Sequence, residues 1–250
     1  NWDATALFFK THKLSAVINC AAYTAVDKAE SDGEMAYKIN TIGADNLSKA
    51  AKDAQAFFVH VSTDFVFDGS KSIPYTENDA RNPQSEYGRT KLAGEERVEG
   101  SGAAFAIVRT AWLYSTGNAN FLNTMLRLGS EKPSLNVVFD QVGTPTAASD
   151  LALALLILVK KQAIEGIDVT GIYHYSNEGV CSWYDFAVRI MKIAHLPCKV
   201  NPIHTSEYPT PARRPAYSVL DKSKIKKVLG IEIPHWEESL EKVIAQKAAK

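Results

Sequence analysis

The sequence predicts an α/β fold built on a doubly wound parallel sheet, and two observations lead to that prediction. Short, nearly continuous apolar runs are typical of strands that are buried on both faces of a sheet. Three such runs occur in the first half of the chain: SAVINCAA (15–22), AFFVHVST (56–63) and AFAIVRTAW (104–112). Two longer segments, 31–54 and 85–100, separate them and carry apolar residues at helical spacing. Strands and helices that alternate in this order form right-handed βαβ crossovers, so the strands are expected to be parallel.

After about residue 113 the alternation loosens, and the sequence predicts a smaller lobe over the carboxyl ends of the strands, where open α/β sheets hold their ligands. A Pro-rich loop (201–215) precedes the final helices of this half. The other elements expected in it are helices at 120–130, 149–162 and 182–195 and short β-like runs at 135–140 and 171–176.

Composition excludes several classes of protein. The chain has 250 residues, of which 46% are hydrophobic, so it can bury a sizeable core. Lys plus Arg number 28 and so do Asp plus Glu, which gives no electrostatic reason to expect nucleic acid or an anionic membrane as a partner. The longest apolar stretch (151–159) is too short to span a bilayer. The first residues (1–13) lack the features of a secretion signal.

The cysteines indicate a reducing compartment. There are three, an odd number, at widely separated positions: Cys20, Cys181 and Cys198. This pattern fits neither a disulfide framework nor a zinc ligand set. The histidines show no ligand spacing, so we expect no metal site. A cytoplasmic location is the resulting prediction.

Small or hydroxylated residues follow each predicted strand of the first half. The three runs end in CAAYT (20–24), STDF (62–65) and RTAWLY (109–114), and a helix with Y-x-x-x-K spacing begins close to the second. Because the carboxyl ends of parallel strands meet at one edge of a sheet, these positions are expected to form one site. Its predicted members are Ala22, Thr63, Asp64, Tyr87, Lys91 and Trp112.

The chemistry of these residues suits reduction of a carbonyl group. Hydride transfer builds negative charge on the carbonyl oxygen, and a proton donor must neutralise it. Tyr87 has an unperturbed pKa near 10, and we expect Lys91, one helical turn away, to lower that pKa by stabilising the phenolate. The hydroxyl of Thr63 can donate a hydrogen bond to the same carbonyl oxygen. The ammonium group of Lys91 has three donors and can also reach a ribose hydroxyl.

Structural roles remain open for each of these residues. A Y-x-x-x-K pair is expected about once by chance in a chain of this composition. Thr63 and Asp64 can simply end a strand and cap a turn. Trp112 suits a hydrophobic core as well as a ligand platform. The pair Arg213–Arg214 suits a solvated loop or the capture of a phosphate.

Taken together, six motifs resemble the dTDP-4-dehydrorhamnose reductase family of extended short-chain dehydrogenases/reductases. The likeness covers the chain from about residue 15 to the C-terminal helix. Y-x-x-x-K marks only the superfamily, whereas AAYTAVDKAE and the ARRP segment are far more restrictive. The motifs are AAYTAVDKAE (21–30), VSTDFVFDG (61–69), YGRTKLAGE (87–95), DQVGTPT (140–146), GIYHYSNEGVCSWYDFA (171–187) and YPTPARRPAYSVLD (208–221).

This resemblance implies reduction of the 4-keto group of dTDP-6-deoxy-L-lyxo-4-hexulose by NADPH or NADH, giving dTDP-L-rhamnose for surface polysaccharide. It implies that Tyr87 is the proton donor, that Lys91 modulates its pKa and contacts the cofactor ribose, and that Thr63 polarises the keto oxygen. It also implies that the substrate is contacted by Asp64, Trp112 and Arg214, of which Arg214 faces the diphosphate. The cofactor cleft is implied to be lined by Ala22, Tyr23, Thr24 and Val61.

The resemblance also sets the expected domains. A partial Rossmann-like NAD(P)-binding domain is expected at 1–113, with later segments such as 135–150 returning to it, and a mainly substrate-binding lobe at 114–250. Such a domain normally opens with a strand and a glycine-rich turn that lets backbone N–H groups approach a pyrophosphate. No such cluster is found among the 14 glycines, so we expect the first βαβ unit to be missing, through a fragment or a chain that carries it elsewhere.

Other questions stay open at this level. The choice between NADPH and NADH normally depends on residues after the second strand of such a domain, which belongs to the missing unit. Some members of the family dimerise through magnesium held by carboxylates, but those positions find no match in this sequence, so we expect no metal and at most a weak homodimer. Two alternative functions are a nucleotide-sugar epimerase of the same superfamily and a non-catalytic subunit resembling the regulatory subunit of methionine adenosyltransferase.

Overall fold

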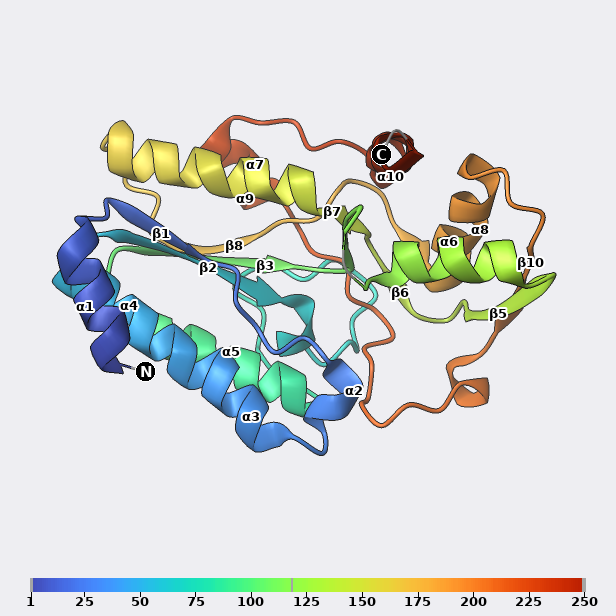
Figure 1. Cartoon of the computed structure of the whole chain (residues 1–250), viewed down its shortest axis with the longest axis horizontal. Coiled ribbons are helices and arrows are strands. Elements are labelled where there is room, and N and C mark those ends of the chain that lie inside the picture. Colours follow the sequence, from blue (N-terminus) through green and yellow to red (C-terminus); the bar gives the residue numbers. More distant parts are fainter. Residues whose placement is uncertain (1, 118, 249–250) are drawn as a thin grey trace.

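A four-stranded parallel sheet forms the centre of the first lobe (Figure 1). The computed structural model describes residues 2–117 and 119–248. The strand order is β1-β2-β3-β8, with Asn19 of β1 opposite His60 of β2 and Thr63 of β2 opposite Thr110 of β3. The predicted α/β fold with a parallel sheet is confirmed. The strands are β1 (Ala16–Asn19), β2 (Phe57–Thr63), β3 (Phe105–Thr110) and β8 (Gly171–His174).

Helices cover both faces of this sheet, and adjacent residues of β2 pack on opposite faces (Figure 1). Phe58 packs with Ile107 on the face covered by α1, α4 and α5, and Val59 packs with Val108 on the face covered by α7 and α9. This alternation is the period-2 pattern of a strand buried on both sides. The first set comprises α1 (Trp2–His12), α2 (Val26–Ala29), α3 (Gly33–Tyr37), α4 (Gly43–Asp53) and α5 (Glu86–Glu99), and the second α7 (Ala148–Val159) and α9 (Ser223–Leu229).

The helices of the first half agree with the predicted segments, with two differences. The predicted helical segment 31–54 contains α3 and α4 joined by a π-helix, η1 (Lys38–Ile42). The helix α1 was not predicted; its only buried residue is Phe9, so its apolar pattern is weak. Two shorter helical turns complete this part, η2 (Asp64–Val66) after β2 and η3 (Lys160–Ile164) after α7.

The second lobe has its own core, built from helices on a two-stranded parallel sheet. Leu122 of α6, Phe186 of α8 and Leu240 of α10 are fully buried in it. Its elements are α6 (Phe121–Glu131), α8 (Trp183–Ile193), α10 (Trp236–Ala248), β5 (Ser134–Val138), β10 (Lys199–Ile203) and the short η4 (Thr205–Glu207). Small ladders pair β4 (Leu113–Tyr114) with β7 (Thr146–Ala147) and β6 (Val142–Gly143) with β9 (Cys181–Ser182).

The segments that return to the first lobe are not those predicted. The strand within 135–150 is β5, which pairs with β10 in the second lobe, whereas β8 and α7 return to the main sheet. The predicted loop 201–215 likewise begins as part of β10. Both differences have the same cause. Tertiary contacts decide which strand an isolated β-like run pairs with, and the spacing of apolar residues in the run carries no information about that partner.

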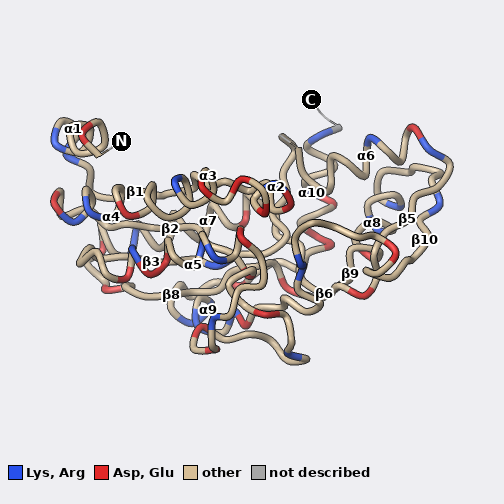
Figure 2. The backbone as a smooth tube through the Cα atoms, turned by 90° about the horizontal axis from the view of Figure 1, so that it is seen from below, with Lys and Arg blue, Asp and Glu red and all other residues tan. Residues whose placement is uncertain are grey.

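Acidic and basic residues are interspersed over the described part of the backbone without gathering on one side (Figure 2). This agrees with the equal numbers of the two charges. Within residues 2–117 and 119–248, no helix is both long enough and apolar enough to cross a membrane.

Candidate active site

The carboxyl end of β2 presents a buried threonine and a buried aspartate. Thr63 ends the strand and caps η2, because its Oγ1 accepts a hydrogen bond of 3.2 Å from the backbone N–H of Phe65. The same hydroxyl donates to Oδ1 of Asp64 at 3.0 Å. Thr63 and Asp64 therefore do end a strand and cap a turn, which is the structural role that the sequence left open for them. Both side chains also lie close to Tyr87.

Helix α5 closely approaches η2, the turn that follows β2, at its first turn. Ser85 caps the helix by accepting a hydrogen bond from the N–H of Gly88 at 3.1 Å. A Cβ atom at Gly88 would collide with the carbonyl oxygen of Phe65, so only glycine allows this approach. The Tyr87 ring then packs edge-on against Phe65, with ring centroids 5.5 Å apart, and its phenol lies close to the Thr63 hydroxyl.

The pKa of Tyr87 is shifted in the direction opposite to the prediction. Burial, assisted by the negative charge of Asp64, raises the pKa of Tyr87 to about 12, although the nearby Thr63 hydroxyl opposes the shift. The predicted lowering by Lys91 is wrong for this structure, since the ammonium group is engaged elsewhere. Lys91 donates to the carbonyl oxygen of Val61 at 2.7 Å and lies 3.4 Å from Nε2 of His60.

Lys91 is almost completely buried between the ends of β1 and β2. Burial lowers its pKa to about 8, and the negative charge of Glu95 opposes this shift. The thiol of Cys20, just after β1, is close enough for Lys91 to lower its pKa, although burial raises that pKa overall. Tyr87 and Lys91 therefore occupy the same edge of the sheet, with Lys91 on the side of β1.

Asp64 carries an oxygen that lacks a well-formed hydrogen bond. Burial raises the pKa of Asp64 to about 6, while bonds from Thr63 and Ser218 pull it down. In the part of the chain that the structure describes, Oδ2 of Asp64 has no partner in good hydrogen-bonding geometry, so the Ser218 contact is a weak one. A buried carboxylate oxygen of this kind has room for an external donor.

Trp112 adopts a strained backbone conformation and stacks on a second tryptophan. Its φ of 48° is unfavourable for a residue with a bulky side chain. The Trp112 ring lies parallel to Trp183 at 3.6 Å between centroids. A Cβ at Gly143 would meet both Trp112 and the hydroxyl of Ser218, so these three residues lie side by side. Backbone strain held in place by packing is typical of functional sites.

A cavity of about 710 Å³ opens beside the tryptophan pair. Arg214 lies on its wall, where it also donates two hydrogen bonds of 2.8 Å to Asp27. The cavity combines aromatic, apolar and polar groups, as is usual for small-molecule sites. Its wall includes Phe121, Thr124, Leu128, Val138, Gln141, Trp183, Tyr208, Thr210 and Arg214.

The residues predicted to line a cofactor cleft follow β1. Asn19 pairs with His60 at the end of β1, and the chain then leaves the sheet, where the backbone N–H of Tyr23 donates to Oδ1 of Asn40 at 2.8 Å. Ala22 is half-buried and Thr24 is exposed, and their small side chains leave the backbone open at this edge. Tyr23 points its hydroxyl to Asp32 at 3.0 Å, so its phenol does not face Lys91.

These groups fit the nicotinamide half of a dinucleotide. The Lys91 ammonium group has three donors, of which the carbonyl of Val61 takes one, so further donors are left for a ribose hydroxyl.

Three further residues at this site were not singled out from the sequence. Ser218 and Trp183 are distant in sequence from the strand ends and meet them only in the folded chain. Glu95 could have been found, since it follows Tyr87 and Lys91 at intervals of four residues and therefore shares their helical face. Among the described residues, no group of three or more His, Cys, Asp or Glu side chains is placed to hold a metal ion.

A Rossmann-like sheet with Thr63 and Asp64 at a strand end and Tyr87 and Lys91 on the adjoining helix defines the class of extended short-chain dehydrogenases/reductases. The family described as RmlD substrate binding domain matches residues 1–249. The chain thus belongs to the RmlD family, which includes the dTDP-4-dehydrorhamnose reductases.

Individual relatives agree with this placement. The dTDP-4-dehydrorhamnose reductase of Sinorhizobium fredii is 42% identical over 233 residues, which are 91% of this chain and 79% of the relative. A crystal structure of a dTDP-4-dehydrorhamnose reductase from Clostridium acetobutylicum is similar with a TM-score of 0.93 and 46% identity, covering 98% of this chain and 85% of that one. The Bacillus anthracis dTDP-4-dehydrorhamnose reductase, solved in complex with NADP, gives a TM-score of 0.93 at 37% identity with the same coverage.

Proposed function

We propose that this protein reduces the 4-keto group of dTDP-4-dehydrorhamnose to give dTDP-L-rhamnose, with NADPH or NADH as the reductant. The observation that carries the proposal is the meeting of Tyr87 with Thr63 at the carboxyl end of β2, one helical turn from Lys91. Membership of a family that includes the dTDP-4-dehydrorhamnose reductases supports the choice of substrate.

Tyr87 is the proton donor in this proposal. Because its pKa is about 12, the phenol is fully protonated at neutral pH and ready to donate. The oxygen of a ketone that receives hydride becomes an alkoxide, which is a stronger base than a phenolate, so proton transfer from Tyr87 remains downhill. Thr63, which lies close to the same phenol, orients the keto oxygen next to it.

Lys91 acts after the proton has left Tyr87. The phenolate that forms is stabilised by a positive charge, and Lys91, one helical turn away on α5, is proposed to supply that charge once substrate and cofactor are bound. With a pKa of about 8, Lys91 is largely charged at neutral pH. Bound NADPH or NADH would supply the hydride, held at its ribose by Lys91 and at its ring by the backbone around Ala22 and Val61.

The substrate is proposed to span Asp64 and the cavity. The free oxygen of Asp64 accepts a hydrogen bond from a sugar hydroxyl, and Trp112 forms the wall against which the sugar ring packs. The nucleotide part then enters the cavity, where Arg214 is the cation that meets the diphosphate. The three free cysteines support a cytoplasmic location, and the weak homodimer stays a prediction.

The test is an assay of NADPH oxidation with dTDP-4-keto-6-deoxy sugar, with the product identified by NMR. We expect one dTDP-L-rhamnose for each NADPH consumed. Epimer exchange without net NADPH consumption would instead assign the epimerase alternative. Binding of the substrate without any turnover, in a chain that binds NADPH, would favour a non-catalytic role.

A further inference from the structure

We propose that Glu95 is a positioning residue for this reaction. From the buried face of α5, its carboxylate keeps Lys91 in the charged form and ties the helix to the end of β2 beside Thr63. The inference rests on the proposed function for its catalytic consequence, but the charge of Lys91 can be measured without turnover.

Glu95 lies directly behind the two residues that carry the chemistry. Tyr87, Lys91 and Glu95 follow each other at intervals of four on α5, which places them in a row along one face. Glu95 is 0% exposed, in a part of the helix where an isolated carboxylate would be costly. A buried charge in line with a reactive pair therefore needs an explanation.

The Glu95 carboxylate connects three elements of the first lobe. Ser62, the residue before Thr63 on β2, donates to Oε1 at 2.5 Å. Arg109 on β3 donates from Nε to Oε1 at 3.0 Å and from Nη2 to Oε2 at 2.7 Å. One side chain therefore fixes α5 to both strands next to the site, and it does so immediately behind Thr63.

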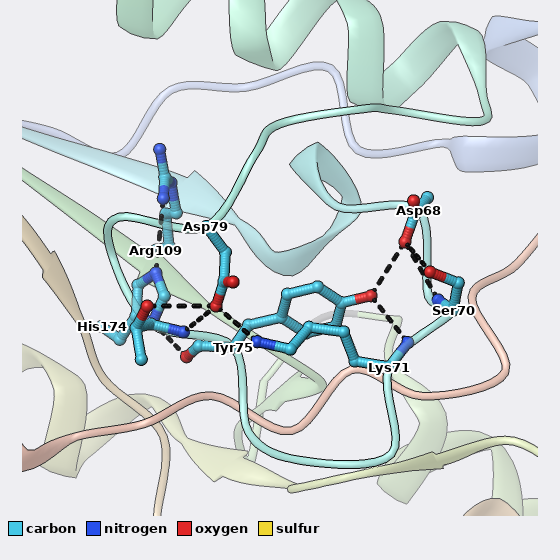
Figure 3. A network of polar contacts seen from close by, with 8 residues as sticks. Asp68, Ser70, Lys71, Tyr75, Asp79, Arg109 and His174 are labelled. Carbon is cyan, nitrogen blue, oxygen red and sulfur yellow. Dashed lines mark hydrogen bonds and ion pairs between the residues drawn. The ribbon is translucent and has the colours of Figure 1, made fainter.

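The far side of Arg109 is held by neutral groups (Figure 3). Its Nη1 lies 3.4 Å from Nε2 of His174, and its guanidinium lies 5.1 Å from the centre of the Phe67 ring. Nδ1 of His174 lies 3.0 Å from the carbonyl oxygen of Tyr75, which assigns the proton to Nδ1 and the acceptor role to Nε2. Burial, with the charge of Arg109, lowers the pKa of His174 to about 3, so Glu95 is the anion that Arg109 faces at closest range.

Glu95 is the carboxylate that acts on the charge of Lys91 from the same face of α5. The other groups that face Lys91 are His60 and the carbonyl of Val61 from β2 and the thiol of Cys20 after β1. Burial, with the charge of Lys91, lowers the pKa of His60, and burial raises the pKa of Cys20, so both are neutral near pH 7. Burial lowers the pKa of Lys91, and Glu95 is the main group that opposes this effect. Without Glu95, Lys91 would lose its proton at a lower pH.

If Glu95 served only to tie α5 to β2 and β3, its loss would not change the pH at which Lys91 loses its proton. The distinguishing measurement is the titration of Lys91 itself, followed by NMR in protein labelled with 13C at the lysine side chains. In Glu95→Gln we expect the Lys91 midpoint to move to lower pH than in the unmodified chain. Arg81 also lies 3.7 Å from Oε2 of Glu95 and pairs with Glu99, so Glu99 is not independent of Glu95. Glu96→Gln is the matched control: Glu96 is exposed on the same helix, so the midpoint should not move. An unmoved midpoint in Glu95→Gln would overturn the proposal.

Loss of the carboxylate also leaves Arg109 buried without its partner, which destabilises the fold. The double variant Glu95→Gln/Arg109→Met removes both charges, and exchange of a buried pair for neutral side chains is often tolerated. Removal of the Arg109 charge opposes part of the effect, so we expect a downward movement of the Lys91 midpoint that is smaller than in Glu95→Gln. A midpoint equal to that of the unmodified chain, in a folded double variant, would also reject the inference.

Turnover gives the second readout. The rate of NADPH-dependent reduction should fall at high pH as Lys91 loses its charge, and in Glu95→Gln this fall should begin at lower pH. A movement of one pH unit lowers the charged fraction about tenfold above the midpoint. If the unmodified protein does not reduce the substrate, the proposed function fails and the NMR titration still decides the role of Glu95. If it does reduce the substrate and both variants keep its pH profile, only the inference fails.

Discussion

Arg214 donates from Nη1 and Nη2 to the two carboxylate oxygens of Asp27, both at 2.8 Å, and so joins segments that are 187 residues apart. Asp27 also accepts a hydrogen bond from the backbone N–H of Ala212 at 3.3 Å. The pair connects α2, which follows the proposed cofactor cleft, to the loop that borders the nucleotide cavity. The sequence predicted Arg214 to face a diphosphate, and the structure adds the carboxylate that holds it at the cavity.

Loss of Arg214 should weaken nucleotide binding. Arg214→Ala removes a charged donor, which typically contributes about 1.5–3 kcal/mol, so the Kd for dTDP is expected to rise about tenfold or more. Asp27→Asn should also raise the Kd for dTDP, but by less, because the Arg214 guanidinium stays in place and loses only its bidentate carboxylate partner. Isothermal titration calorimetry with dTDP measures both. Arg213→Ala is the control: Arg213 is exposed and its side chain bonds Gln84, so equal weakening in that variant would contradict the assignment.

Removal of the Tyr87 hydroxyl should abolish most of the chemistry but little of the binding. Tyr87→Phe keeps the ring packed on Phe65 and removes the proton, so kcat is expected to fall by about 10²- to 10⁴-fold. The Kd for the dTDP-sugar should change little. Tyr37→Phe, at an exposed tyrosine on α3, serves as the control and should be fully active. A Tyr87→Phe variant that turns over at the normal rate would exclude Tyr87 as the proton donor.

Asp64 should make the protein less stable as pH rises. Its folded pKa of about 6 is above the usual value of 3.8, so the folded state retains the proton over that interval and stability falls as pH rises through it. The loss is at most about 3 kcal/mol above pH 6. Asp64→Asn lacks this penalty, so its stability relative to the unmodified chain should increase between about pH 4 and pH 7 in urea unfolding.

Asp68 provides a comparison of opposite sign. Hydrogen bonds from Ser70 lower the pKa of Asp68 to about 2, so its stabilising contribution is present above the usual value of 3.8 and lost as pH falls toward 2. Asp68→Asn should therefore be less stable than the unmodified chain at neutral pH. A gain in stability for Asp68→Asn, or a constant difference for Asp64→Asn, would contradict these assignments.

The glycine at position 88 should be needed for activity as well as for folding. In Gly88→Ala the new methyl group meets the carbonyl of Phe65 and the side chain of Pro83, so α5 must move away from η2, and we expect Tyr87 to move away from Thr63 with it. We expect lower thermal stability together with a large fall in kcat. Gly43→Ala is the matched control, since its Cβ would be 3.7 Å from the nearest atom, and it should stabilise the helix by about 0.5–1 kcal/mol.

Much of the first lobe could be predicted because its signals are local. The runs at 15–22, 56–63 and 104–112 became β1, β2 and β3, and the segment 85–100 became α5, since burial on both faces or on one stripe is written into the order of apolar residues. Helix α1 escaped prediction because it buries little more than Phe9. The strand β5 was placed in the wrong sheet because its partner, β10, lies far along the chain.

The order of residues along the chain by itself determined the parallel sheet, the family motifs and the candidates Thr63, Tyr87 and Lys91. Only the tertiary structure decided which charge each of them faces. Lys91 donates a hydrogen bond to the carbonyl of Val61 on β2, and the charge of Glu95 raises the pKa of Lys91 against the effect of burial. The pKa of Tyr87 is raised to about 12, whereas the sequence predicted that it would be lowered. Helical spacing fixes which side chains share a face, whereas a pKa depends on the water removed and the charges brought near by distant segments.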